Sequence, residues 1–232
     1  MIIGADVSHA APGSQQPSMA AMTVSMDTTA TRYAAAVETN GHRVEMIATR
    51  NLEDMLRPLF TEWAQTVGQG RMPKHIYYFR DGVSEGQYQA VLKAEVADIK
   101  RMVYEMSATN PNYEVCWIYI MLGSLHANVL QCKFTVVVAE KRHHIRFFPP
   151  RGMASDKNNN PVPGTLVEKD VTHVNEYDFY LCSHAAIQGT ARPTHYHVLL
   201  DDANMEPNEF QAMLYEHSYQ YMRATTPVSL CK

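Results

Sequence analysis

Three short apolar runs occupy the first part of the chain, and turn residues separate them. Residues 2–9, 19–26 and 33–39 are each apolar over the length of a strand. A loop rich in Pro, Gly and Ser follows the first run, and Asn40-Gly41 follows the third. This spacing predicts three sequential strands in an antiparallel meander.

The hydrophobic pattern then changes to the period of amphipathic helices. Apolar residues recur at spacings of three and four from 52 to 67 and again from 88 to 106. Asn51 is the predicted N-cap of the first helix. Ser84 and Gln87 form a predicted capping box at the start of the second.

Further strands alternate with these helices and follow them. They are predicted at residues 75–79, 134–139, 178–184 and 195–200, and Pro207 begins a last helix. The order of strands and helices predicts an α/β fold, with a mixed central sheet covered by helices. No internal linker divides the chain, so we expect one domain.

The composition is that of a globular domain, because 46% of the 232 residues are apolar and 19% are charged. It excludes a disordered tail and a small disulfide-stapled scaffold. The net charge of −4 gives no global sign of a nucleic-acid partner. The first residues lack the basic and apolar regions of a signal peptide, and the four cysteines have no metal-binding spacing. We therefore expect free thiols in a reducing compartment.

Two aspartates end predicted strands, where α/β folds place their functional sites. Asp6 closes the first apolar run, and Asp81 closes the strand that begins at residue 75. Carboxylates on neighbouring strand ends could hold Mg²⁺, which prefers oxygen ligands, and two such ions can promote phosphodiester cleavage. The alternative is that each aspartate caps a turn, as Asp-Gly pairs often do.

A basic stretch spans residues 133–151, in which Glu140 is the acidic residue, and Phe147 and Phe148 add stacking surface. Such a patch suits a phosphate backbone, and the alternative is a solvated basic loop. The basic residues are Lys133, Lys141, Arg142, Arg146 and Arg151.

Two histidines, His195 and His197, are expected on one face of a strand because they are two residues apart. A histidine pair could bind zinc, but we expect no third ligand nearby. A hydrogen-bonded structural pair is therefore the favoured interpretation.

Residues 115–132 contain no charged side chain and are close to the length of a membrane span. Gly, Ser, His, Asn and Gln dilute the second half, so composition favours a buried helix or a hairpin over a membrane span.

Five motifs, in order along nearly the whole chain, resemble the PIWI domain of eukaryotic Argonaute proteins, of fungal type. They are Gly4–His9 (GADVSH), Tyr78–Gln87 (YFRDGVSEGQ), Lys141–His144 (KRHH), Asp178–Thr190 (DFYLCSH and QGT) and Arg192–Val198 (RPTHYHV).

The resemblance implies an RNase H-like fold and guide-directed cleavage of RNA. It implies an Asp-Glu-Asp-His site that holds two Mg²⁺ ions, or alternatively Mn²⁺. Asp6 and Asp81 match the two aspartates, which hold metal. Glu45 matches the glutamate, which a loop carries into the site. The family's histidine follows the segment that matches 227–229, and its position is beyond Lys232. We therefore expect this chain to show little or no cleavage by itself.

The resemblance also implies RNA-binding positions and partners. The expected partners are a small guide RNA, a complementary target RNA and Trp-bearing silencing proteins, and no membrane partner is expected. The expected location is the cytoplasm or, alternatively, the nucleus. The residues that match guide-binding positions are Lys141, Arg142, His144, Arg146, His184, Gln188, Arg192, Tyr221, Arg223 and Ser229.

The resemblance assigns residues 1–232 to a partial PIWI domain without the N, PAZ and MID domains. Residues 115–132 have no counterpart in it, which indicates a translated intron or alternatively a true insertion. Three other functions stay open: a non-catalytic nucleic-acid-binding module, an unrelated RNase H-like DNA nuclease, and a gene-model fragment without function.

Overall fold

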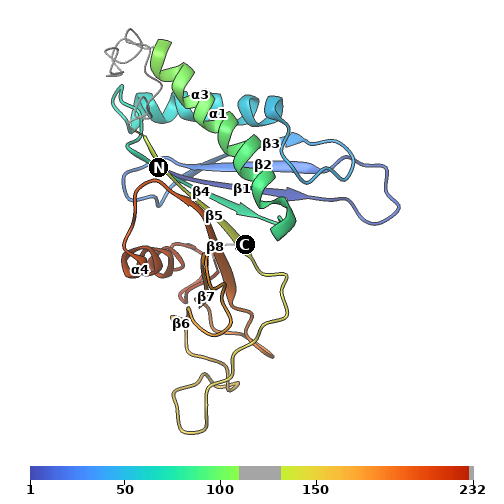
Figure 1. The fold of residues 1–232 in the computed structure, drawn as a ribbon, viewed down its shortest axis with the longest axis vertical. Coiled ribbons are helices and arrows are strands. Elements are labelled where there is room, and N and C mark those ends of the chain that lie inside the picture. Colours follow the sequence, from blue (N-terminus) through green and yellow to red (C-terminus); the bar gives the residue numbers. More distant parts are fainter. Residues whose placement is uncertain (110–131, 230–232) are drawn as a thin grey trace. The chain divides into compact units, whose positions relative to one another are not determined.

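A computed structural model describes residues 1–109 and 132–229, and the chain divides into two compact units, residues 1–136 and 137–232. The ribbon in Figure 1 runs from blue through green in the first unit and from yellow to red in the second. Among the described residues, no helix is long and apolar enough to cross a membrane.

The first unit contains a mixed sheet. Strands β1 (Ile2–Ser8), β2 (Met19–Ser25) and β3 (Tyr33–Thr39) form the predicted antiparallel meander. Strand β4 (His75–Asp81) pairs with β1 in parallel, and β5 (Lys133–Glu140) follows β4 in the strand order. The sheet of this unit therefore has the order β3-β2-β1-β4-β5, and β1 lies between a parallel and an antiparallel neighbour.

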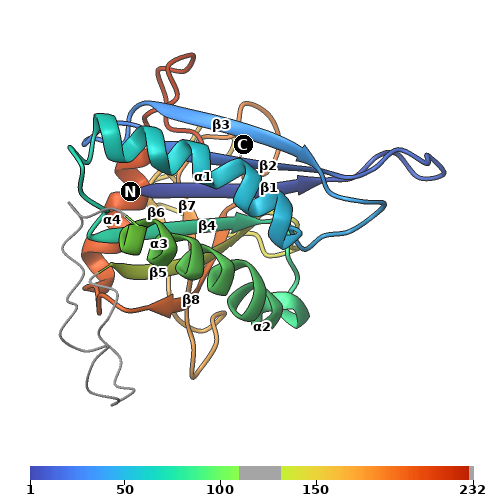
Figure 2. The same ribbon diagram turned by 90° about the horizontal axis from the view of Figure 1, so that it is seen from above.

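Helices cover one face of this sheet. Helix α1 (Thr49–Thr66) buries an apolar stripe that includes Leu52, Phe60 and Trp63, and it contacts β2, β3 and α3 (Ala97–Thr109). Figures 1 and 2 show α1 and α3 side by side on the same face of the strands. The predicted N-cap was wrong: α1 begins at Thr49 with Ala48 as N-cap. Asn51 instead lies in the first turn, where its side-chain amide donates to the Thr39 carbonyl at 2.7 Å.

The second helical segment is interrupted where it covers β4. The predicted capping box of Ser84 and Gln87 is present and opens a 3₁₀ turn, η1 (Glu85–Gln87), followed by α2 (Tyr88–Ala90). Then comes a π-helical turn, η2 (Val91–Val96), before α3. A π turn widens the helix by one residue per turn, and such turns are frequent near functional sites. This one contains Glu95, whose side chain is completely buried.

The second unit has its own antiparallel strands. Strand β7 (Tyr177–Cys182) pairs with β6 (Thr165–Val167) on one side and with β8 (Thr194–Asp201) on the other. Helix α4 (Pro207–His217) begins at Pro207 as predicted. An aromatic core joins these elements: the Phe179 ring stacks on Tyr196 at 5.4 Å and meets Phe210 of α4 edge-on at 6.1 Å.

Candidate functional site

The two predicted strand-end aspartates lie at the same end of a parallel strand pair. The register of β1 and β4 places Ala5 opposite Arg80, and Asp6 and Asp81 are the next residues of the two strands. Asp6 is exposed and Asp81 is half-buried. The carboxyl ends of neighbouring parallel strands thus bring these side chains to one edge of the sheet, as the sequence predicts.

Gly82 marks the point where a third carboxylate joins them. Its φ is +84°, and a Cβ at this position would lie 3.3 Å from Glu45 Oε1 and 3.5 Å from Asp6 Oδ1. A side chain would therefore be strained at Gly82 and would crowd both carboxylates. The glycine leaves room for Glu45 and Asp6 to approach the turn that follows Asp81.

Glu45 is held in place by contacts at both its side chain and its backbone. It lies in the loop between β3 and α1, and its side chain is only 18% exposed. His9 Nε2 is 2.7 Å from Glu45 Oε2, and His9 Nδ1 is 2.7 Å from the hydroxyl of Ser18. Arg80 Nη2 donates to the Glu45 carbonyl at 2.6 Å and lies 3.4 Å from Oε1. The loop therefore presents Glu45 in one defined position.

The same loop is tied together by one buried amide side chain. Asn40 is 3% exposed, and its Nδ2 donates to the carbonyls of Val44 and Met46 at 3.0 and 2.8 Å. Its Oδ1 accepts from the backbone of Ala48 at 3.1 Å and from Asn51 Nδ2 at 3.2 Å. The Asn40 side chain thus supplies hydrogen-bond partners for backbone groups of the loop that carries Glu45, groups that other backbone atoms do not pair.

Arg80 connects this loop to the helical layer. Its side chain is fully buried, and Nε donates to Glu95 Oε2 at 3.1 Å while Nη1 donates to the Asp81 carbonyl. Glu95 Oε1 also accepts from the Ile47 backbone at 2.9 Å, and Oε2 accepts from the Tyr78 hydroxyl at 2.7 Å. Arg80 therefore contacts β4, the Glu45 loop and the π turn at once.

These burial and charge relations set the protonation states of the network. Burial and the neighbouring Glu95 carboxylate raise the pKa of Tyr78 well above 10, so its hydroxyl stays protonated and donates. Burial opposes charge on Arg80, but the carboxylate of Glu95 outweighs it and the pKa of Arg80 is raised. The guanidinium is therefore charged throughout the physiological range.

The donor set at Gly82 suits a hard divalent cation. Asp6, Glu45 and Asp81 offer carboxylate oxygens, which Mg²⁺ prefers, and Gly82 provides the space where two of them converge. They are more widely spaced than the two groups of ligand-type side chains found among the described residues, whose donor atoms all lie within 4.8 Å of one another. The residues present therefore fit the predicted Mg²⁺ in chemistry, in an open arrangement.

The pattern of the sequence alone misses Glu45, and the resemblance supplies it. The sequence does contain a signal for the ion pair that supports the Glu45 loop. Arg80 alternates with Ile76 and Tyr78 on the buried face of β4, and Glu95 falls on the apolar face of the following helix. Two opposite charges at buried positions of adjacent elements indicate an ion pair.

Predicted RNA-binding residues in the second unit follow β5 and flank β7 and β8. Arg142, His144, Gln188 and Arg192 are exposed, and Lys141, Arg146 and His184 are half-buried. Arg146 Nη1 donates to the backbone carbonyls of His143 and Ile145 at 3.0 and 2.6 Å, so its side chain supports its own segment.

Two side chains hold these segments against the strands. His143 Nε2 lies 2.9 Å from the Pro193 carbonyl, and burial lowers the pKa of His143, so a neutral ring donates this bond. Asn160 Nδ2 donates to the Gly189 carbonyl at 2.9 Å, and its Oδ1 accepts from the Ala191 backbone at 2.9 Å. Gln188 and Arg192 thus lie on a loop with a defined shape.

The remaining three predicted residues differ in exposure. Tyr221 and Arg223 are exposed after α4. Ser229 is 3% exposed, and its hydroxyl lies 2.8 Å from that of Thr194 at the start of β8. The structure therefore places Ser229 in a structural contact and not on the surface.

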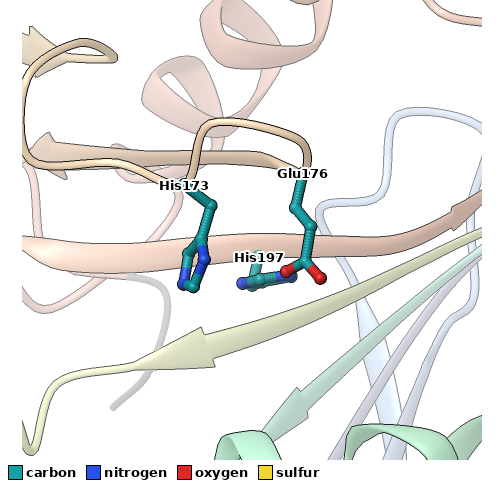
Figure 3. Close-up of side chains that lie close together, drawn as sticks. All are labelled: His173, Glu176 and His197. Atoms are coloured by element: carbon teal, nitrogen blue, oxygen red, sulfur yellow. The ribbon is translucent and has the colours of Figure 1, made fainter.

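The histidine pair has a surrounding that the sequence does not predict. His195 and His197 lie on β8 and are both buried, with ring centroids 6.0 Å apart. Each contacts a carboxylate: His195 Nε2 lies 2.7 Å from Asp178 Oδ2, and His197 Nε2 lies 2.8 Å from Glu176 Oε2. The expectation that no third ligand lies near was wrong, because His173 and Glu176 also lie beside His197 (Figure 3).

The segment predicted to be an insertion, 115–132, lies outside the described residues except for Cys132. Cys132 is buried immediately before β5.

The first unit is an α/β structure with a mixed sheet, helices on one face and acidic residues at one end of a parallel strand pair, and comparison with known proteins identifies the family. The Piwi domain model matches residues 1–232, and the chain belongs to the Piwi domain family. It is 40% identical to Protein argonaute 3 of Oryza sativa, over 99% of this chain and 19% of that protein. It is 36% identical to Protein argonaute of Schizosaccharomyces pombe, over 99% of this chain and 25% of that protein. The chain thus spans about a fifth to a quarter of these relatives.

Solved structures show the same fold. The C-terminal lobe of a budding yeast Argonaute matches 98% of this chain and 43% of its own, with a TM-score of 0.82 and 28% identity. Kluyveromyces polysporus Argonaute, solved with a guide RNA, matches 98% of this chain and 26% of its own, with a TM-score of 0.80 and 28% identity. These lobes have the RNase H-like fold, so the predicted fold class and family are confirmed.

The buried ion pair yields the first prediction. Glu95→Gln keeps the size of the side chain but leaves the Arg80 charge without its counterion, and we expect the free energy of unfolding to fall by about 3–5 kcal/mol. Urea unfolding of the chain measures this. The control is Asp54→Asn, which breaks the exposed pair with Arg50 and should change stability by less than about 1 kcal/mol. Equal effects of the two variants would contradict the role given to Glu95.

The loop amide yields the second prediction. Asn40→Ala removes four hydrogen bonds, and we expect a loss of roughly 2–4 kcal/mol of stability and faster tryptic cleavage after the exposed Arg43. Unfolding curves and timed proteolysis measure both. Asn208→Ala, at an exposed position in α4, is the control. Cleavage after Arg43 at the wild-type rate would show that Asn40 does not hold the loop.

Proposed function

We propose that this domain binds small RNA in RNA silencing and that Asp6, Glu45 and Asp81 hold Mg²⁺ for cleavage of a target RNA. The observation that carries the proposal is the convergence of Asp6 and Glu45 at Gly82, directly after Asp81. The family supports it, since the matched Kluyveromyces polysporus Argonaute was solved with a guide RNA.

The three carboxylates have separate duties in this proposal. Asp6 and Asp81 are fixed by the paired strands β1 and β4, and they would provide the permanent metal ligands. Glu45 comes from a loop, and His9 and Arg80 hold its carboxylate and backbone at the site. Bound Mg²⁺ would stabilise the negative charge that develops on a phosphodiester during cleavage.

Arg80 would contribute by position. Its guanidinium donates hydrogen bonds to Glu95 and to the backbone carbonyls of Glu45 and Asp81. It therefore positions the backbone of two of the three acidic residues and remains itself buried. Cleavage is electrostatically demanding, and ligands held in advance lower the reorganisation that binding requires.

In this proposal the domain binds metal through the three carboxylates and RNA through a separate surface. RNA binding in this proposal depends on the second unit, where Arg142, His144, Gln188 and Arg192 are exposed. Binding and cleavage are therefore separable by mutation.

Metal binding at the carboxylates is the third prediction. We expect Mn²⁺, added as a magnetic substitute for Mg²⁺, to bind the chain and to be weakened about tenfold or more by Asp6→Asn or Asp81→Asn, because each removes an anionic ligand. Water-proton relaxation measures the affinity. Asp54→Asn removes an exposed carboxylate of α1 and should leave it unchanged. Mn²⁺ affinity equal to wild type in both Asp6→Asn and Asp81→Asn would contradict the proposed site.

RNA binding is the fourth prediction. Arg142→Ala and Arg192→Ala should each weaken binding of a short single-stranded RNA and reduce the slope of log affinity against log salt by about 0.7, because each removes one phosphate contact. Fluorescence anisotropy at several salt concentrations measures this. Lys169→Ala is the control, since Lys169 is exposed but outside the predicted interface. Unchanged slopes in both arginine variants would argue against this surface.

A further inference from the structure

A second cluster of ligand-type side chains lies in the second unit around His197. The donor atoms of His173, Glu176 and His197 all lie within 4.8 Å of one another. Figure 3 shows the three side chains pointing toward one another, two from the segment before β7 and one from β8. We propose that His173, Glu176 and His197 form a binding site for a divalent transition-metal cation of the Zn²⁺ type.

The geometry is close to what such a cation needs. Zn²⁺ takes imidazole nitrogen and carboxylate oxygen at about 2.0–2.2 Å, which places tetrahedral donors about 3.4 Å apart. His197 Nε2 and Glu176 Oε2 are 2.8 Å apart, and the rings of His173 and His197 are 5.4 Å apart at 68°. All three donor atoms lie within 4.8 Å of one another, which is close to the spacing that a tetrahedral ion requires.

The chemistry of the donors distinguishes this site from the carboxylate site. Two imidazoles and one carboxylate form a mixed nitrogen and oxygen set, which favours Zn²⁺ over Mg²⁺. Three protein ligands leave a fourth position for water or another ligand. Glu176 has a side chain that is 57% exposed and His173 is exposed, so a cation can enter from solvent.

The inner wall of the site is built and buried. The Asp178 side chain is 1% exposed, and its Oδ1 accepts from the His173 backbone at 2.8 Å while Oδ2 lies 2.7 Å from His195 Nε2. His197 itself has a side chain that is only 4% exposed. Asp178 therefore fixes the backbone of one ligand and the histidine next to another on the strand, as outer carboxylates do at metal sites.

The segment that carries the two outer ligands is also anchored elsewhere. Gln211 of α4 donates to Glu168 Oε2 at 3.1 Å, and the Thr172 hydroxyl donates to the Glu168 carbonyl at 3.1 Å. Residues 168–176 are thus positioned by α4 on one side and by Asp178 on the other. A cation would find its ligands in place, and it would link this segment to β8.

The test uses the chain 1–232, stripped with a chelator and kept in excess Mg²⁺ to occupy the carboxylate site. We expect one equivalent of Co²⁺ to give the visible absorption of a four- or five-coordinate ion, without the near-ultraviolet band of thiolate ligands, and Zn²⁺ to displace it. His173→Ala and Glu176→Gln should each weaken Zn²⁺ affinity about tenfold or more. Zn²⁺ should also raise the unfolding temperature of wild type but not of His173→Ala.

The controls separate this site from other sources of binding. His42→Ala and Glu209→Gln change exposed residues of the same types elsewhere and should bind Zn²⁺ as wild type does. His173 and Glu176 are exposed, so their variants test the site without a change to the buried His197. Binding that is equal in wild type, His173→Ala and Glu176→Gln would overturn the proposal, as would its loss in Asp81→Asn alone or the absence of any cobalt band.

Discussion

The Arg80 guanidinium is buried completely, and it forms an ion pair with Glu95, whose carboxylate is equally buried. Each partner also binds a part of the candidate site: Arg80 holds the carbonyls of Glu45 and Asp81, and Glu95 holds the backbone of Ile47. The pair therefore ties β4, the π turn and the loop of Glu45 to one another. The position of the third carboxylate depends on this pair, because the loop itself contributes no regular backbone pairing at Glu45.

A buried ion pair is an expensive way to join three segments. Removing two charges from water costs several kcal/mol for each ion, and well-packed apolar residues often stabilise a fold as well or better. The network offsets this cost with additional hydrogen bonds from Tyr78 and Ile47 to the Glu95 carboxylate. Apolar residues could not supply the directed guanidinium donors, which bond the backbone carbonyls of Glu45 in its loop and of Asp81 at the end of β4. The pair thus favours a specific arrangement of the site over maximal stability.

The sequence predicts most of the first unit because its elements follow simple periods. The meander, the apolar stripe of α1 and the capping box at Ser84 are all present, and Asp6 and Asp81 lie together where the parallel pairing of β1 and β4 ends. Glu45 could not be predicted from periodicity, since a loop position is set by distant partners such as His9 and Arg80. The start of α1 was misplaced for a related reason: the Asn51 side chain serves the β3 carbonyl end rather than the helix N-terminus. The surroundings of His197 were missed because His173 and Glu176 are brought to it by the pairing of β7 with β8.

The two units use the same physical device for different donor sets. In each, one buried charged side chain contacts both the backbone of a loop and a second titratable side chain: Arg80 with the Glu45 loop and Glu95, and Asp178 with His173 and His195. A loop that carries ligands has a conformational entropy that metal binding would otherwise have to overcome. When a buried charge restrains that loop in advance, less of the binding free energy is lost to ordering. The buried polar residues of this chain are therefore best interpreted as supports for exposed ligands, and their positions indicate where those ligands lie.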